Sequence, residues 1–159
     1  MLHGRTSGLA RLAMTATPKP VYIHATAIAI SGQGILISGR SKAGKSTLAE
    51  RLIAEAQSCG LEASLIGDDR IGLSIIDQGI RLTPHPAIAG LIERRGTGIV
   101  PVPYREGAIA RFEIALVEGA VLAPVRFEPL PGHPIPGLVV GPRPDASALF
   151  PLVLAALPQ

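Results

Sequence analysis

Apolar and polar residues alternate in several short segments and follow a helical period in one longer segment. From Val21 to Ile30 the residues alternate and are rich in β-branched side chains, and a turn at 31–34 separates them from a second apolar run at 35–38. This pattern predicts a β-hairpin. Between Lys45 and Cys59, apolar side chains recur every three or four residues before Gly60. That spacing predicts an amphipathic helix of about four turns that ends at the glycine.

The other predicted elements are short and have glycine or proline at their boundaries: a buried strand at 63–66, a hairpin of strands at 72–77 and 80–83, a short helix at 87–91, an extended segment at 99–102 and a half-exposed strand at 111–117. Beyond Ala123 prolines and glycines multiply, so we expect little regular structure there. A terminal helix is predicted at 148–157, with Pro151 in its first turn. Together these elements predict an α/β fold with more hairpins than a doubly wound domain has.

The length of 159 residues predicts one domain. No acidic residue precedes Glu50, and the first twenty residues mix Arg, Ser, Thr, Ala and Leu. We interpret 1–20 as a loose N-terminal extension, with a transit peptide as the alternative, and 21–159 as the domain.

The composition excludes several classes of protein. The net charge is +3, there are few aromatic residues and there is no tryptophan, which argues against stacking platforms for nucleic acid. No apolar run reaches the roughly eighteen residues that a membrane span needs. The single cysteine, Cys59, fits a reducing compartment. We therefore expect a soluble, cytoplasmic protein that binds neither nucleic acid nor membrane.

The clearest motif is G-x-x-x-x-G-K-[ST], between the strand ending at Ser38 and the helix beginning near Lys45. Such a P-loop wraps main-chain amides around phosphates, while its lysine reaches the β- and γ-phosphates and its serine can bind Mg²⁺. The alternative is a chance glycine-rich turn. The predicted nucleotide-binding residues are Gly39, Arg40, Ser41, Lys42, Ala43, Gly44, Lys45, Ser46 and Thr47.

Two acids, Asp68 and Asp69, follow the strand that comes after the P-loop helix. A carboxylate that holds a metal ion belongs at that position in P-loop enzymes. One of the two could face the metal or act as the base for an incoming hydroxyl. The alternative is an Asx turn before Arg70.

Two further candidates are ambiguous when taken alone. A single histidine in an apolar strand, such as His24, is more often a core residue than an active-site residue. The charged run from Glu93 to Arg95, before Gly96-Thr97-Gly98, is typical of a solvated turn.

Taken together, these motifs resemble the catalytic domain of HPr kinase/phosphorylase, from His24 to about Val102. The resemblance rests on four segments in order: H-A-T-A-I-A, G-R-S-K-A-G-K-S-T, G-D-D and A-G-L-I-E-R-R-G-T-G-I-V. It implies a P-loop kinase fold of the HPr kinase/PEP carboxykinase-like type, with a mixed sheet and hairpins flanking the P-loop helix. It also implies an enzyme that uses ATP and Mg²⁺ to phosphorylate a serine of the phosphocarrier HPr, and a homo-oligomer, a hexamer in the family.

The resemblance also implies a role for individual residues. His24 matches an active-site histidine and Lys45 the P-loop lysine, while Ser46 and Glu93 match magnesium ligands. The aspartate pair matches the catalytic acid, with Asp69 favoured over Asp68 as the base. Arg95 lies in a loop that the family uses in catalysis, and Arg126 is a weaker candidate for a late catalytic arginine.

The chain departs from the family pattern in three respects. Only about twenty residues precede the motif region, Lys42 stands where glycine is usual, and Arg94 replaces an aliphatic residue. No segment clearly matches the element linked with dephosphorylation, so kinase activity is better supported than phosphorylase activity. Two other functions remain open: a small-molecule P-loop kinase and a regulatory nucleotide-binding module without turnover.

Overall fold

The computed structural model describes residues 18–158. The predicted N-terminal extension at 1–20 therefore lies outside the described residues, apart from its last three positions. Within the described part, no helix is both long enough and apolar enough to span a bilayer.

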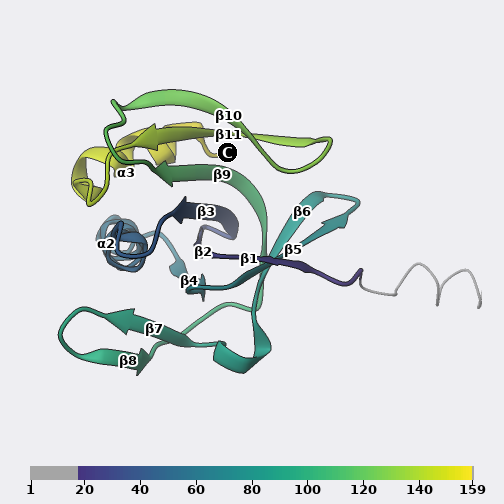
Figure 1. The fold of residues 1–159 in the computed structure, drawn as a ribbon, viewed down its shortest axis with the longest axis horizontal. Helices are drawn as coiled ribbons and strands as arrows, with labels where there is room; N and C mark the ends of the chain where they lie inside the picture. The colour runs from purple at the N-terminus through teal and green to yellow at the C-terminus, as the bar shows by residue number, and fades with distance from the viewer. Residues whose placement is uncertain (1–17, 159) are drawn as a thin grey trace, which may run out of the picture.

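Most described strands join one curled, mixed sheet (Figure 1). Its main path runs β1-β5-β6-β9-β3-β2-β4, and β11 and β10 extend it beyond β9. The bounds of its strands are β1 Val21–Ile23, β2 Ala25–Ile30, β3 Gln33–Gly39, β4 Ala63–Gly67, β5 Ile71–Ile76, β6 Gly79–Pro84, β9 Ala108–Leu116, β10 Ala123–Leu130 and β11 His133–Val140. The predicted α/β fold with hairpins around a central helix is confirmed.

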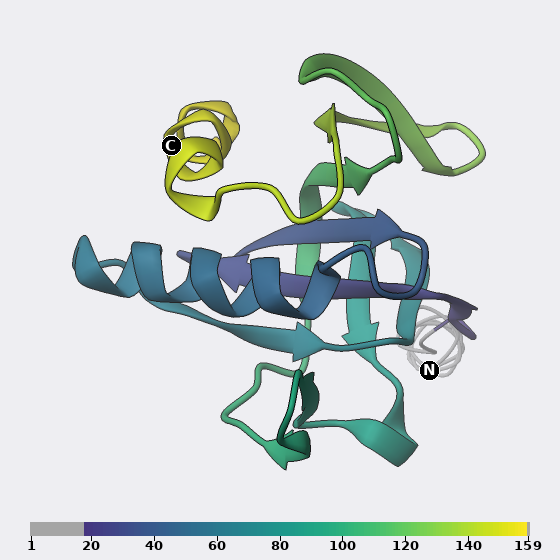
Figure 2. The same cartoon turned by 60° about the vertical axis from the view of Figure 1, so that its left-hand side comes forward.

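Two helices cover one face of the sheet. Helix α2 (Lys45–Ser58) packs against β2, β3 and β4, and α3 (Ala146–Ala156) lies beside it (Figure 2). Alternate residues of each strand face opposite sides, so Ile35 and Ile37 belong to the core under α2 whereas Leu36 belongs to a second core on the other face. The helix period predicted from Leu48 and Leu52 is confirmed, because both side chains are buried.

A separate hairpin projects from the sheet on the far side of α2 from β10 and β11 (Figure 1). It is formed by β7 (Leu91–Arg94) and β8 (Gly98–Pro101), and the 3₁₀ turn η1 (Pro86–Ile88) precedes it. The helix predicted at 87–91 is therefore wrong after Ile88. Gly90 adopts a φ of 75°, which ends the helical turn and lets Leu91 begin a strand.

The strand predicted from Val21 to Ile30 is two strands. The chain bends at His24, so β1 pairs with β5 while β2 pairs with β3 and β4. The half-exposed strand predicted at 111–117 is also wrong in its burial. β9 lies between neighbours on both sides, and of its residues only Arg111 is exposed.

The C-terminal third differs most from the structure that the sequence predicted. β10 and β11 form an antiparallel hairpin where little regular structure was expected. Its prolines fit because, among the strands of residues 18–158, β10 pairs with β11 alone, and the parallel pairing of β11 with β9 begins only at Gly137. At such positions a missing N–H leaves no ladder partner unsatisfied. The hairpin brings β11 alongside β9 and leads the chain to α3.

The terminal helix begins two residues earlier than predicted. Asp145 caps it, since its Oδ1 accepts a hydrogen bond from the Ser147 amide at 3.0 Å. Pro151 consequently lies inside the helix and not in its first turn.

Candidate functional site

The predicted P-loop segment connects β3 to α2, as its motif requires. The parallel strands β3, β9 and β11 end at the same edge of the sheet, where ligands bind in open α/β sheets. The loop turns sharply at Gly39 and Gly44, with φ of 148° and 98°. A side chain on Gly39 would lie 2.8 Å from the Leu116 carbonyl oxygen, so glycine is required there on steric grounds.

Lys45 lies beneath this loop, with its ammonium group held by the loop itself. Its Nζ donates to the carbonyl oxygens of Gly39 and Arg40, at 2.9 and 2.8 Å. Burial lowers the pKa of Lys45, and the charges of Asp68 and Asp69 partly oppose that effect. The lysine is therefore a positioned, poorly hydrated cation at the start of α2.

Asp68 is a buried carboxylate surrounded by donors from three elements. Its Oδ1 accepts hydrogen bonds from the hydroxyl of Thr26 on β2, at 2.7 Å, and from that of Ser46 on α2, at 2.8 Å. Its Oδ2 accepts from the Ser46 hydroxyl at 2.9 Å and from the Glu93 amide at 3.1 Å. Asp68 therefore links the P-loop helix, the sheet and the β7–β8 hairpin.

Asp69 points the other way and is mostly exposed. Its backbone φ is 70°, a left-handed conformation that aspartate tolerates better than most residues. Its Oδ1 lies 2.9 Å from Nδ1 of His24, and Nε2 of His24 lies 3.4 Å from the Ser41 hydroxyl. The alternative of His24 as a core residue is wrong, since half of its side chain is exposed.

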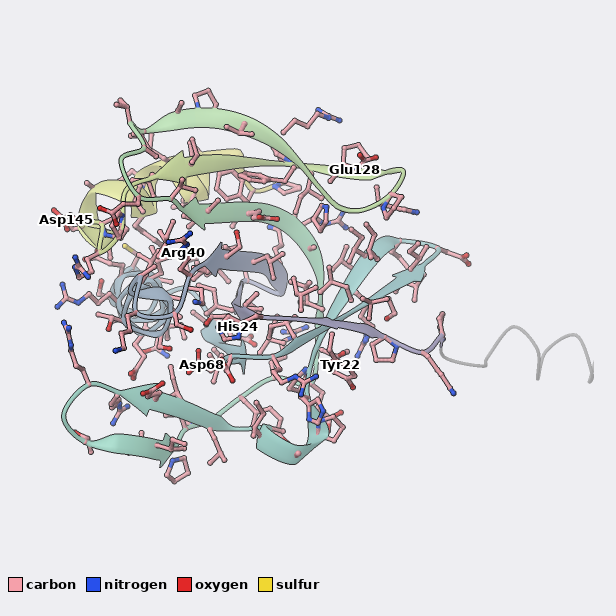
Figure 3. The ribbon with its side chains drawn as sticks, in the orientation of Figure 1. Tyr22, His24, Arg40, Asp68, Glu128 and Asp145 are labelled. Carbon is pink, nitrogen blue, oxygen red and sulfur yellow. The ribbon has the colours of Figure 1, made fainter. Side chains whose placement is uncertain are left out.

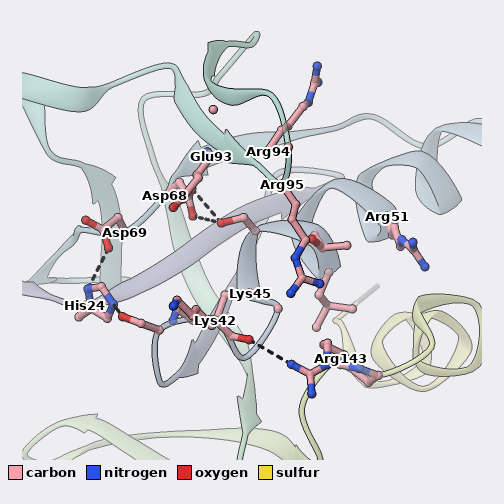
Figure 4. Close-up of a pocket in the computed structure, with 18 residues that line it drawn as sticks. His24, Lys42, Lys45, Arg51, Asp68, Asp69, Glu93, Arg94, Arg95 and Arg143 are labelled. Carbon is pink, nitrogen blue, oxygen red and sulfur yellow. Dashed lines mark hydrogen bonds and ion pairs between the residues drawn. The ribbon is translucent and has the colours of Figure 1, made fainter.

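These groups line one open pocket of about 980 Å³ (Figure 4). Such a volume suits a ligand of nucleotide size. His24 and Asp69 lie at one end, Lys45 lies in the middle, and Arg51 and Arg143 lie at the other end. The pocket is rich in cations, which favours a polyanionic ligand.

The structure brings most of the predicted site residues together. Of the predicted catalytic and metal-binding residues, the pocket is lined by His24, Lys45, Ser46, Asp68, Asp69, Glu93 and Arg95. Gly39, Arg40 and Ala43 line a smaller neighbouring pocket behind the loop.

Arg126 does not join the site. It is exposed on β10 and lines neither pocket. Glu128, two residues further along β10, lies toward the upper edge of the molecule, away from Asp68 (Figure 3). Arg126 therefore lies outside the pocket of this chain, on a strand at the edge of the sheet, and its role as a catalytic arginine stays a prediction.

Several residues at the site were not predicted, among them one threonine and two arginines. Thr26 contacts Asp68, and Arg51 and Arg143 line the pocket. Arg143 stands between two prolines just before α3. This placement is the only feature of the sequence that sets Arg143 apart from other arginines. Its proximity to the P-loop depends on the β10–β11 hairpin, which the sequence did not predict.

The charged turn predicted at Glu93–Arg95 is part of a tethered hairpin. Arg94 donates two hydrogen bonds from Nε and one from Nη2 to the Glu50 carboxylate of α2, at 2.8 to 3.1 Å. This contact raises the pKa of Arg94, chiefly through the hydrogen bonds. The tether holds Glu93 and Arg95 over the pocket.

The oxygen donors present suit Mg²⁺. The Ser46 hydroxyl and the Asp68 carboxylate lie together at the P-loop, and Glu93 lies beside them (Figure 4). Hard oxygen ligands are those that Mg²⁺ prefers, and it commonly takes one or two from the protein and others from phosphate and water. Within residues 18–158, no group of three His, Cys, Asp or Glu side chains forms a preassembled metal cluster. The donor set fits a metal ion that arrives with phosphate.

A family model and curated proteins that match this chain are all HPr kinases. The family model "HPr Serine kinase C-terminal domain" matches residues 16–115. The HPr kinase/phosphorylase of Clostridium novyi is 33% identical over 85 residues, which is 54% of this chain and 26% of that protein. The HPr kinase/phosphorylase of Mycoplasma mycoides is 39% identical over 84 residues, 53% of this chain and 25% of that protein.

A solved structure shares the fold. The Hpr(Ser) kinase/phosphatase from Coxiella burnetii superposes with a TM-score of 0.71 at 24% identity, covering 85% of this chain and 95% of that one. The matched region spans only about a quarter of the length of the curated relatives.

Proposed function

The chain belongs to the HPr serine kinase C-terminal domain family, and on that premise we propose that it transfers the γ-phosphoryl group of ATP to a serine hydroxyl of the phosphocarrier HPr. The observation that carries this proposal is the meeting of three groups in one pocket: the loop at 39–46, the Ser46–Asp68 pair and the His24–Asp69 pair. Phosphoryl transfer needs a phosphate cradle, a metal site and a base, and the three groups supply them.

The loop and Lys45 would hold the phosphates. When a triphosphate enters, the Lys45 ammonium can exchange its bonds with the Gly39 and Arg40 carbonyls for bonds to phosphate oxygens. The exposed arginine Arg95 adds positive charge along the pocket wall. Stabilising the charge on the transferred group is the main catalytic contribution expected in this class of reaction.

Ser46 and Asp68, with Glu93 beside them, would hold Mg²⁺. Bound there, Mg²⁺ would neutralise the phosphate charge and orient the triphosphate. Asp68 is already fixed by Thr26 and by the Glu93 amide, so its position costs no rearrangement of the backbone.

Asp69 would act as the base. Its carboxylate takes the proton of the incoming serine hydroxyl as the new Oγ–P bond forms, and the bond between the γ-phosphorus and the bridging oxygen breaks to release ADP. His24 positions Asp69 through the 2.9 Å contact. Asp69 is mostly exposed, which suits a base that must meet a residue of another protein.

The test is direct transfer. The protein is incubated with Mg-ATP and HPr, and tandem mass spectrometry then locates the phosphoryl group. We expect one phosphoserine on HPr, lost when the acceptor serine is replaced by alanine. Asp69→Asn should lower transfer by about 10²- to 10⁴-fold while keeping Mg-ATP affinity.

Other outcomes would point elsewhere. Binding of ATP without any transfer to HPr would contradict the kinase proposal and favour a regulatory nucleotide-binding module. Turnover with a metabolite as acceptor would favour a small-molecule kinase. The homo-oligomer and the cytoplasmic location stay predictions, the first to be measured by light scattering.

A further inference from the structure

Arg143 is a pocket residue held in a strained conformation. Its φ is 51°, a left-handed value that is costly for a residue with a side chain. Its amide donates to the Ala43 carbonyl at 2.9 Å, and its Nη1 donates to the Lys42 carbonyl at 3.4 Å. The chain therefore fixes Arg143 directly against the P-loop, and neither the phosphate cradle nor the base described above needs it there.

The position of the base decides which way a bound nucleotide runs. In phosphoryl transfer the attacking and leaving oxygens lie roughly in line on opposite sides of the phosphorus. Asp69 and His24 occupy one end of the pocket, so the acceptor hydroxyl approaches from that end. The leaving ADP must then extend to the opposite end, beyond Lys45.

That opposite end is formed by Arg51 of α2 together with Arg143 and Pro144 of the loop before α3 (Figure 4). We infer that it is the nucleoside subsite, where the ribose and base of ATP lie and the planar guanidinium of Arg143 packs on the base. A guanidinium favours the face of an aromatic ring, and the ring of Pro144 adds apolar surface. This inference rests on the proposed use of ATP and adds the residues that recognise its nucleoside.

Two ligands distinguish a contact of Arg143 with the base from a contact with phosphate. ATP carries both a triphosphate and a nucleoside, whereas inorganic tripolyphosphate carries only the phosphates. If Arg143 contacts the base, its loss weakens ATP and spares tripolyphosphate. If Arg143 contacts phosphate, its loss weakens both ligands equally.

The experiment is isothermal titration calorimetry of the whole chain with Mg-ATP and with Mg-tripolyphosphate. Arg143→Ala should raise the Kd for ATP about tenfold and leave that for tripolyphosphate within about twofold. Arg143→Lys keeps the charge but not the plane, so it should weaken ATP nearly as much. Arg111→Ala, an exposed arginine on β9 outside the pocket, is the matched control and should change neither constant. Melting curves check that each variant folds, and Arg143→Lys tests the idea if Arg143→Ala does not fold.

Equal weakening of both ligands by Arg143→Ala, or no weakening of ATP, would overturn the subsite. A wild-type chain that binds neither ligand would overturn the proposed function itself, which distinguishes the two failures.

Discussion

The hydroxyl of Ser46 lies 2.8 and 2.9 Å from the two carboxylate oxygens of Asp68, which joins the first turn of α2 to the end of β4. Thr26 and the Glu93 amide donate to the same carboxylate. Asp68 therefore has two separable roles. It is the shared acceptor of a buried hydrogen-bond network, and it is a candidate ligand for Mg²⁺.

Two substitutions should separate these roles. Asp68→Ala leaves buried donors without an acceptor and should lower the free energy of unfolding by about 3 kcal/mol. Asp68→Asn keeps the shape and one carbonyl oxygen, so it should cost about 1 kcal/mol yet still lower Mg²⁺-dependent transfer by about a hundredfold or more. Urea denaturation and the HPr assay measure the two effects. An Asp68→Asn variant with normal transfer would remove Asp68 from the metal site.

Lys45 should make nucleotide binding sensitive to alkaline pH. Only the charged ammonium attracts phosphate, and burial lowers the pKa of Lys45 below its ordinary value of 10.5. Affinity for Mg-ATP should therefore fall as the pH rises through this lowered pKa, earlier than for a solvated lysine. Lys45→Ala should weaken binding by about 2 to 3 kcal/mol and remove the dependence that Lys45 causes. Calorimetry across the alkaline range measures both effects, and an unchanged affinity in Lys45→Ala would contradict the P-loop assignment.

Lys42 stands in the P-loop at a position where the family resemblance leads us to expect glycine, and its φ of 68° is left-handed. A left-handed residue with a Cβ is strained by about 1 kcal/mol or more, and glycine is not. Lys42→Gly should therefore be more stable than Lys42→Ala by about 1 kcal/mol. Both variants lose the same charge, so the difference between their melting temperatures isolates the backbone strain. Equal stability of the two would mean that the loop relaxes when the side chain changes.

The site near the P-loop could be predicted from the sequence because its parts are local. A strand, a glycine-rich turn and a helix follow each other directly from Gln33 to Ser58, and Asp68 closes the next strand. Each of these elements has its own hydrophobic period or its own glycines, so the pattern alone was sufficient.

The parts of the fold and of the site that were not predicted depend on contacts between segments distant in the sequence. Arg143 reaches the loop only because β11 pairs with β9. The prolines of β10 and β11 lower the strand propensity of both segments, so propensity alone does not predict the hairpin. Likewise the burial of Glu113 comes from neighbours on both sides of β9, which alternation along a single strand cannot reveal.

Glu113 should make the stability of the fold depend on pH. It lies in the middle of β9, only 7% exposed, and accepts a hydrogen bond from the Ser38 hydroxyl at 2.8 Å, one residue before the P-loop. Burial raises the pKa of Glu113 above its ordinary value of 4.5, and the bond from Ser38 opposes part of that rise. The native state therefore holds this proton more tightly than the unfolded chain does. The contribution of this bound proton to the free energy of unfolding is complete below pH 4.5, and it is lost as the pH rises through the pKa of Glu113 in the folded protein.

Glu113→Gln keeps an acceptor for Ser38 but cannot ionise. Its stability relative to the wild type should consequently rise with pH across that window and then become constant. Ser38→Ala should shift stability in the opposite direction at neutral pH, because the ionised carboxylate loses its donor. Urea denaturation at a series of pH values measures all three proteins. Parallel stability curves for the wild type and Glu113→Gln would show that Glu113 ionises equally easily in the folded and unfolded chain, and that the Ser38 contact does not couple the P-loop strand to pH.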